Sequence, residues 1–153
     1  MSDYSGPGIY EIVPVSAPGM NLNVWGGAQT PGTQLKLYPR TSSGRNTQFA
    51  IVASGGTQGK PEKGDREYLL IAVNSGLYIA SNDDALVTTE LRSPTDGTIR
   101  WRLQHAGNGA FYINNAGTGK QLNVRGGAKE TGTEIIVYSP TEAGNSQFFL
   151  KAV

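Results

Sequence analysis

The 153-residue chain contains no cysteine, which excludes a disulfide scaffold and any metal site built from thiolates. Its formal net charge is only +1, from 13 Lys and Arg against 12 Asp and Glu, and no segment carries a run of one sign. A protein that binds a nucleic-acid backbone needs a basic surface, so nucleic acid is not an expected partner. No apolar run approaches the roughly 18 residues that a membrane span requires, so membrane insertion is not expected either.

Features of a secreted protein are also missing from the sequence. The first residues, MSDYSGPGIYEI, do not contain a basic segment followed by an apolar one, so we expect no signal peptide. There is no Asn-x-Ser/Thr acceptor for N-glycosylation. Together with the absence of cysteine, these observations predict a cytoplasmic protein. The length predicts one domain that spans residues 1–153.

Glycine and proline are abundant, and helical periodicity is missing. The 21 glycines and eight prolines interrupt every window in which apolar residues could recur at helical spacing. Short segments rich in β-branched and aromatic residues occur instead, separated by turns that contain Gly, Asn, Asp or Pro. The sequence predicts an all-β fold. Twelve strands are expected, at residues 8–15, 21–25, 33–38, 49–53, 68–73, 77–80, 86–91, 100–104, 110–114, 121–125, 134–138 and 148–152.

One glycine-containing segment occurs twice, 100 residues apart: residues 22–44 and 122–144 are identical at 11 of 23 positions. Each group of four expected strands closes with a polar stretch and an aromatic residue, at Phe49, Trp101 and Phe148. The central group belongs to the same series, because residues 93–96 align with 139–142. We therefore expect three repeats, at approximately 8–54, 67–106 and 109–153. They would close an antiparallel sheet around a pseudo-threefold axis, with the three aromatics in the core.

This pattern resembles the ricin-B-like β-trefoil lectins. The motifs GIYEIVP at 8–14, NLNVW at 21–25 and YPR at 38–40 are similar to those of the small fungal lectins of the Sclerotinia agglutinin type. The Gln-x-Trp ending of the family is altered, because the Gln position is taken by Thr47, Ile99 and Ser146. The likeness covers the whole chain. It implies a β-trefoil fold and a lectin or agglutinin that binds carbohydrate without catalysis or a cofactor.

No group of residues predicts catalysis or a metal site. The single histidine, His105, ends an expected strand, and there is no Gly-x-Ser-x-Gly motif to supply a nucleophile. The two Gly-Lys segments lack the spacing of a phosphate-binding loop, since Pro61 or Gln121 follows the lysine where Ser or Thr is needed. Asp83 and Asp84 are adjacent, as in a hairpin turn, and do not alternate as calcium ligands would.

A sugar site needs a flat aromatic side chain and several fixed polar groups. In the first repeat, Trp25 begins a Gly-Gly loop, Tyr38 and Arg40 end the third strand, and Asn46 precedes the fourth. The resemblance implies that Tyr38 is the aromatic platform, and that Asn23 stands where the family has an acceptor Asp. The expected carbohydrate-binding residues are Asn23, Trp25, Gly26, Gly27, Tyr38, Arg40 and Asn46.

Each of these side chains also has a structural interpretation. Trp25 could belong to the core, although its equivalent Arg125 could hardly do so. Tyr38 recurs as Tyr138, Asn46 could cap a turn, and Arg40 could be a solvated charge. The glycines are first of all turn residues.

The other two repeats have changed at these positions. The alignment places Arg92, Pro94 and Thr98 where the first repeat has Tyr38, Arg40 and Asn46, so the second repeat is expected to have lost its site. The third repeat has Arg125 for Trp and Pro140 for Arg. A possible weak second site remains there, formed by Asn123, Tyr138 and Asn145.

The expected function is therefore a lectin with one main site in the first repeat. The resemblance implies terminal galactose or N-acetylgalactosamine on glycoproteins or glycolipids as the ligand, and a homodimer as the assembly. The alternative is a protease inhibitor that acts through a surface loop, for which residues 55–66 form the single long candidate. A structural or actin-associated trefoil would leave the differences between the repeats unexplained.

Overall fold

The computed structural model describes residues 2–40, 44–55 and 66–153. The twelve predicted strands are confirmed, and the helical segments of the described residues are single 3-10 turns. None of these segments has the length and apolar character needed to cross a membrane. The strands are β1 (Gly8–Pro14), β2 (Met20–Val24), β3 (Leu35–Pro39), β4 (Phe49–Gly55), β5 (Glu67–Ala72), β6 (Tyr78–Ser81), β7 (Val87–Glu90), β8 (Arg100–Gly107), β9 (Ala110–Asn115), β10 (Gln121–Val124), β11 (Ile135–Tyr138) and β12 (Phe148–Ala152).

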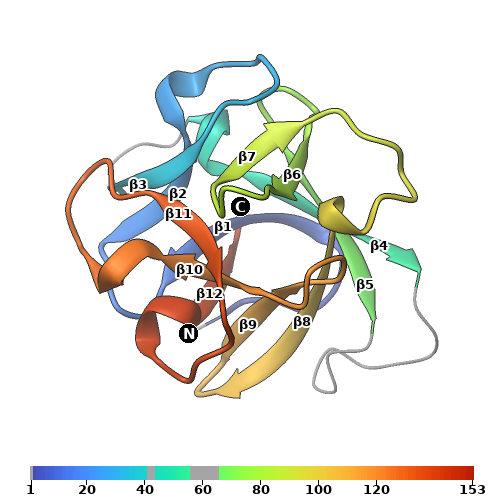
Figure 1. The fold of residues 1–153 in the computed structure, drawn as a ribbon. Coiled ribbons are helices and arrows are strands. Elements are labelled where there is room, and N and C mark those ends of the chain that lie inside the picture. Colours follow the sequence, from blue (N-terminus) through green and yellow to red (C-terminus); the bar gives the residue numbers. More distant parts are fainter. Residues whose placement is uncertain (1, 41–43, 56–65) are drawn as a thin grey trace.

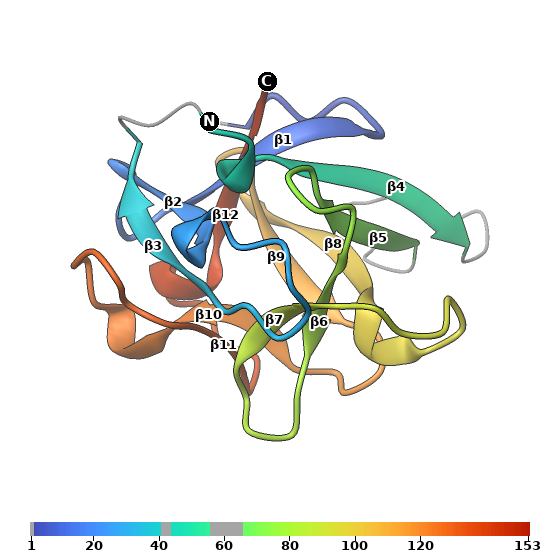
Figure 2. The same ribbon diagram turned by 90° about the horizontal axis from the view of Figure 1, so that it is seen from above.

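Six strands form a closed antiparallel barrel in the order β1, β4, β5, β8, β9, β12, with β12 pairing back to β1. Closure satisfies the backbone groups that an open sheet would leave at its edges. The other strands form three hairpins, β2–β3, β6–β7 and β10–β11. Each repeat therefore contributes one hairpin and two barrel strands, and their arrangement can be followed in Figures 1 and 2. This architecture is a β-trefoil.

The three hairpins contact one another in a ring. The loop of the first repeat bonds to β7 of the second, the loop of the second bonds to β11 of the third, and the loop of the third bonds to β3 of the first. Each hairpin is therefore flanked by a loop from a different repeat. The bonds run from Gly32 N to Thr89 O at 2.7 Å, from Val137 N to Ala85 O at 2.9 Å, and from Gly132 N to Leu37 O at 2.9 Å.

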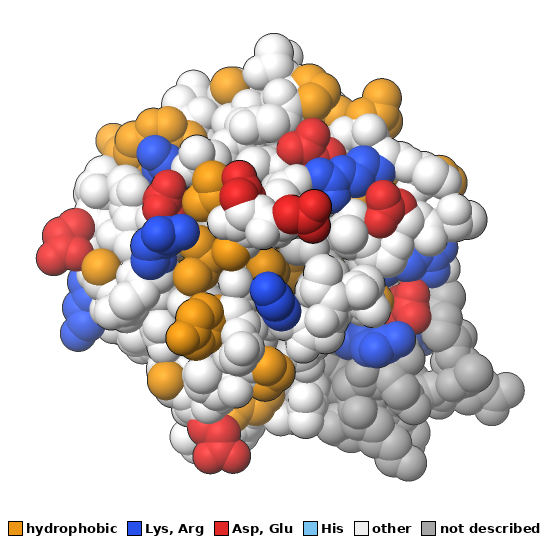
Figure 3. Space-filling view, viewed as in Figure 1, with side chains coloured by type: hydrophobic (Ala, Val, Ile, Leu, Met, Phe, Trp, Pro, Cys, Tyr) orange, Lys and Arg blue, Asp and Glu red, His pale blue; other side chains and the backbone are white. Residues whose placement is uncertain are grey.

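The core lies inside the barrel and under the hairpins. Phe49, Trp101 and Phe148 are each 0% exposed, which confirms the prediction that the repeats close on core aromatics. The indole of Trp101 also donates a 2.9 Å hydrogen bond to the carbonyl oxygen of Ile79, as a buried indole N–H requires. On the face shown in Figure 3, Lys and Arg side chains lie among Asp and Glu side chains.

Candidate functional site

A pocket of about 420 Å³ lies in the first repeat, where the β2–β3 hairpin meets the turn before β4. Strand β2 ends at Val24, the 3-10 turn Trp25–Gly27 follows it, and a second turn, Arg45–Thr47, precedes β4. The structure brings five of the seven predicted residues together at this pocket. The lining residues are Asn23, Trp25, Gly26, Tyr38 and Asn46.

The glycines have a backbone role in this arrangement. Gly26 and Gly27 have φ values of 67° and 68°, in the left-handed region that residues with a Cβ rarely adopt. The chain can therefore turn sharply directly after Trp25. This turn ends the strand at the pocket rim and leaves the indole ring outside the core.

Two asparagines form the polar wall of the pocket. The Asn46 Nδ2 group donates to Asn23 Oδ1 and to the Val24 carbonyl oxygen, both at 3.2 Å. Asn23 is only 4% exposed, so this contact satisfies an amide oxygen that is largely removed from water. The two bonds fix the orientation of the Asn46 amide before any ligand arrives.

Two aromatic rings also line the first-repeat pocket. Trp25 is 37% and Tyr38 39% exposed, and their ring centroids are 6.4 Å apart with an interplanar angle of 66°. The Lys36 Nζ atom lies 5.1 Å from the centroid of Trp25, close enough for a cation–π contact. Gly132, from the third repeat, lies beside the outer edge of the indole, where an added Cβ would be 3.6 Å from Trp25 Cη2. The structure thus excludes a core position for Trp25.

Arg40, which we expected beside this pocket, is held elsewhere. Its Nε and Nη2 atoms contact the Glu11 carboxylate at 3.3 and 3.1 Å, and its Nη1 atom lies 3.5 Å from the Pro18 carbonyl oxygen. A guanidinium matches a carboxylate with two parallel bonds, which orients the side chain toward β1. The residues that line the pocket do not include Arg40.

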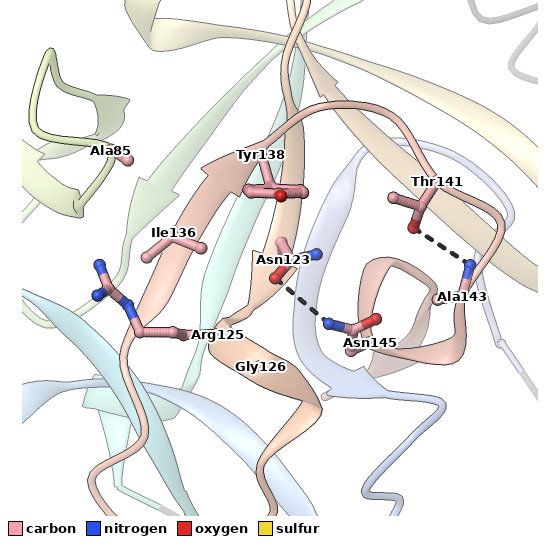
Figure 4. A pocket seen from close by; sticks show the side chains of 9 residues that line it. All are labelled: Ala85, Asn123, Arg125, Gly126, Ile136, Tyr138, Thr141, Ala143 and Asn145. Carbon is pink, nitrogen blue, oxygen red and sulfur yellow. Dashed lines mark hydrogen bonds between the residues drawn. The ribbon is translucent and has the colours of Figure 1, made fainter.

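A second and larger pocket, of about 540 Å³, lies at the equivalent position in the third repeat (Figure 4). Asn123, Tyr138 and Asn145, which the sequence marks as a possible second site, all line it. Its complete lining is Ala85, Asn123, Arg125, Gly126, Ile136, Tyr138, Thr141, Ala143 and Asn145.

The polar wall of this third-repeat pocket repeats that of the first. Asn145 Nδ2 donates to Asn123 Oδ1 at 3.4 Å (Figure 4). It also donates to the Val124 carbonyl oxygen at 2.9 Å. Arg125 replaces the tryptophan and pairs with Glu134 at 3.2 Å. The third-repeat pocket therefore keeps the asparagine pair but has one aromatic ring instead of two.

Sequence reasoning missed the apolar side of the third-repeat pocket. Ile136 and Ala85 lie there, and Ala85 belongs to the β6–β7 loop of the second repeat. Figure 4 shows Ala85 reaching the pocket from a separate loop. No pattern within the third repeat could identify a residue that comes from another one.

In the second repeat, the side chain of Arg92 occupies the equivalent place. Its Nη1 atom donates to the Ser81 carbonyl oxygen and to Thr98 Oγ1, both at 2.8 Å, and its Nη2 atom bonds to Asn82 Oδ1. The Ser81 carbonyl is the equivalent of those that Asn46 and Asn145 contact in the other repeats. In the second repeat, the Arg92 side chain thus donates to the equivalent of the carbonyl that the asparagine contacts in the other two repeats.

The strand register corrects one detail of the alignment. Asn21 pairs with Tyr38 and Gln121 pairs with Tyr138, whereas the equivalent Tyr78 pairs with Glu90. Glu90, and not Arg92, therefore occupies the tyrosine position of the second repeat.

The available chemistry is that of recognition. His105 packs against Phe111 with ring centroids 4.5 Å apart, and it lines neither of the two pockets. In the part of the chain that the structure describes, no three His, Cys, Asp or Glu side chains gather as a metal site would require. What the pockets present is aromatic rings, oriented amides and backbone groups, which suit a neutral ring that carries hydroxyl groups.

Comparison with known proteins agrees with this chemistry. The family model described as ricin-type beta-trefoil lectin domain-like matches residues 57–138. An agglutinin from Sclerotinia sclerotiorum is 34% identical over 157 residues, which cover 97% of this chain and 98% of the agglutinin.

Two solved structures share the fold at lower identity. The Rhizoctonia solani agglutinin has a TM-score of 0.75 and 23% identity, over 98% of both chains. The Macrolepiota procera ricin B-like lectin, solved in complex with lactose, has a TM-score of 0.70 and 20% identity, over 99% of this chain and 100% of that one.

Proposed function

Because this chain belongs to the ricin-type β-trefoil lectin family, whose members bind carbohydrate without catalysis, we propose that it recognises terminal galactose or N-acetylgalactosamine. Glycoproteins and glycolipids would carry these sugars. The main site in this proposal is the first-repeat pocket.

The observation that carries the proposal is the pairing of Trp25 and Tyr38 with an oriented amide in one pocket. An aromatic face covers the C–H groups of a pyranose, while Asn46 and the nearby backbone groups can bond to its hydroxyls. The choice of sugar is supported by the lactose complex of the Macrolepiota procera lectin, since lactose ends in galactose. The absence of a charged acceptor at Asn23 is the main departure from the family pattern.

Replacing Trp25 tests this assignment. A monosaccharide in a shallow site typically binds near millimolar, about 4 kcal/mol in all, and an aromatic platform contributes on the order of 1 kcal/mol or more. Trp25→Ala should therefore reduce galactoside binding by the first repeat about tenfold or more, measured by calorimetry. Because the indole is exposed, the melting temperature should change little.

Arg125→Ala is the matched control, since it removes the equivalent side chain of the third repeat. It should leave binding at the first repeat unchanged. A Trp25→Ala protein that unfolds would show a structural role for the indole, and one that binds normally would show that the first-repeat pocket is not the main site.

We also propose that the protein is a homodimer, on the basis of the sequence resemblance alone. The inhibitor alternative depends on the loop at 55–66, of which residues 56–65 lie outside the described residues. The two formed pockets favour sugar binding over that alternative.

A further inference from the structure

A shallow groove of about 290 Å³ lies next to the third-repeat pocket. Thr141 lines both the pocket and the groove, so the two form one continuous surface. The groove is lined by Gln104, Tyr112, Gln121, Pro140, Thr141 and Glu142.

Three hydrogen-bonded side-chain amides link two residues of the groove, Gln121 and Gln104, through Asn114. The Thr141 backbone N–H donates to Gln121 Oε1 at 3.0 Å, and Gln121 Nε2 donates to Asn114 Oδ1 at 3.1 Å. Asn114 Nδ2 then donates to Gln104 Oε1 at 3.3 Å. Each of these amides orients the next one. Gln104 is exposed, and its amino group bonds to none of the described residues. This amino group can therefore donate to a ligand.

The first repeat has an ion pair at the place equivalent to this groove. Asn21, the equivalent of Gln121, donates from Nδ2 to Glu11 Oε1 at 2.8 Å, and strand pairing puts Glu11 at the position of Tyr112. Arg40 stands at the position of Pro140 and pairs with the same Glu11. Pro140 has no group that could form such a pair, so the amides of the third repeat face no charged partner there, and the exposed one among them is Gln104.

We propose that the third repeat binds an oligosaccharide across two adjoining subsites, with a terminal sugar in the third-repeat pocket and the next sugar in the groove. This inference rests on the proposed function, because it requires that the asparagine-walled pockets bind sugar. The groove offers amide groups and the ring of Tyr112, which suit a neutral pyranose. Glu142 on its edge disfavours an acidic sugar.

The test compares one sugar with two. In a Trp25→Ala background, methyl β-galactoside is measured against a panel of neutral disaccharides that end in galactose or N-acetylgalactosamine, with different linkages. At least one disaccharide should bind about fivefold to tenfold more tightly than the monosaccharide, as one or two added hydrogen bonds and a ring contact would give. Adding Tyr112→Ala and Gln104→Ala should remove that gain and leave monosaccharide affinity unchanged.

A second variant imports the first-repeat ion pair into the third repeat. Tyr112→Glu combined with Pro140→Arg, in the same background, should abolish the preference for the disaccharide while the pocket still binds the monosaccharide. Thermal unfolding of each variant identifies any that fail to fold. As a matched control, a protein with intact Trp25 and Asn145→Ala should bind both sugars through the first repeat with similar affinity.

Three results would overturn the inference. The Trp25→Ala protein could bind all disaccharides no better than the monosaccharide, the groove substitutions could leave the gain intact, or the background could bind no sugar while the unaltered protein binds. The last result removes the third-repeat site and preserves the first-repeat proposal. An unaltered protein that binds none of these sugars would instead reject the proposed function.

Discussion

Ala85 is one of two non-glycine residues with a positive φ in the described chain, with a value of 71°. A left-handed conformation costs an L-residue with a Cβ roughly 1–2 kcal/mol, so this position would ordinarily favour glycine. Its methyl group lines the third-repeat pocket, which gives the alanine a reason to be there. An unusual conformation next to a binding surface is where local stability is commonly exchanged for shape.

We therefore expect Ala85→Gly to raise the free energy of unfolding by up to about 1 kcal/mol, after the greater freedom of glycine in the unfolded chain is subtracted. Urea denaturation measures this change. The same variant should bind sugar more weakly at the third repeat, since an apolar contact is lost. A clear loss of stability would contradict the strain interpretation.

Arg92 should behave in the opposite way, because it contacts three acceptors within its own repeat. Arg92→Ala would leave those groups without their partner and should lower the free energy of unfolding by about 1–3 kcal/mol. It should not create a sugar site, because Glu90 and not an aromatic residue stands at the tyrosine position. Sugar binding by the second repeat in this variant would refute that argument.

The direction of a long charged side chain is harder to predict from sequence than that of a short or rigid one. Trp25 and the two asparagine pairs could be placed from the repeat, because short or rigid side chains follow the local backbone. Arg40 could not, since its partner Glu11 is 29 positions away in sequence and is brought near only by folding.

At the scale of elements, all twelve strands could be predicted, because alternation and turn residues are local signals. Register across the β6–β7 hairpin could not be predicted. Its loop is shorter than those of the other two repeats, so an alignment anchored on the motif at 93–96 places Arg92 two positions beyond the true tyrosine equivalent, Glu90. Contacts between hairpins, such as that of Ala85 at the third-repeat pocket, form only in the folded protein, so they could not be predicted either.

The 3-10 turn Gly97–Ile99 gives a test at this scale. Asp96 precedes it, and its Oδ1 accepts from Thr98 Oγ1 at 2.6 Å and from Thr98 N at 2.9 Å. These hydrogen bonds, the side-chain one first, lower the pKa of the Asp96 carboxyl below its ordinary value. The carboxylate therefore stabilises the fold at pH values above the unfolded pKa, and this contribution is lost as the pH falls through the folded pKa.

Asp96→Ala should accordingly lower the free energy of unfolding at neutral pH by about 1 kcal/mol, the usual effect of losing such a cap. The difference from the unaltered protein should shrink as the solution is acidified, which denaturation at several pH values would measure. A difference that stays constant into acid would mean that the carboxylate charge is not responsible.

At the scale of the whole molecule, the question is how many sugars one particle can hold. Agglutination requires at least two productive sites on each particle. If the homodimer proposal is correct, the Asn145→Ala protein, with only its first-repeat site, should still agglutinate cells. Light scattering and agglutination measured together check this, and a monomer that loses agglutination on Asn145→Ala would reject the dimer and support two sites in one chain.

The ring of hairpin contacts has a consequence for a chain that carries all three repeats. Trp25 of the first-repeat pocket lies against Gly132 of the third repeat, and the third-repeat pocket includes Ala85 of the second, so each pocket has a contact with a neighbouring repeat. A single repeat by itself would complete such contacts only as a closed trimer, and its affinity for sugar would then depend on its own concentration. Three copies in one chain remove that dependence, and each copy can also differ in sequence, as these pockets do.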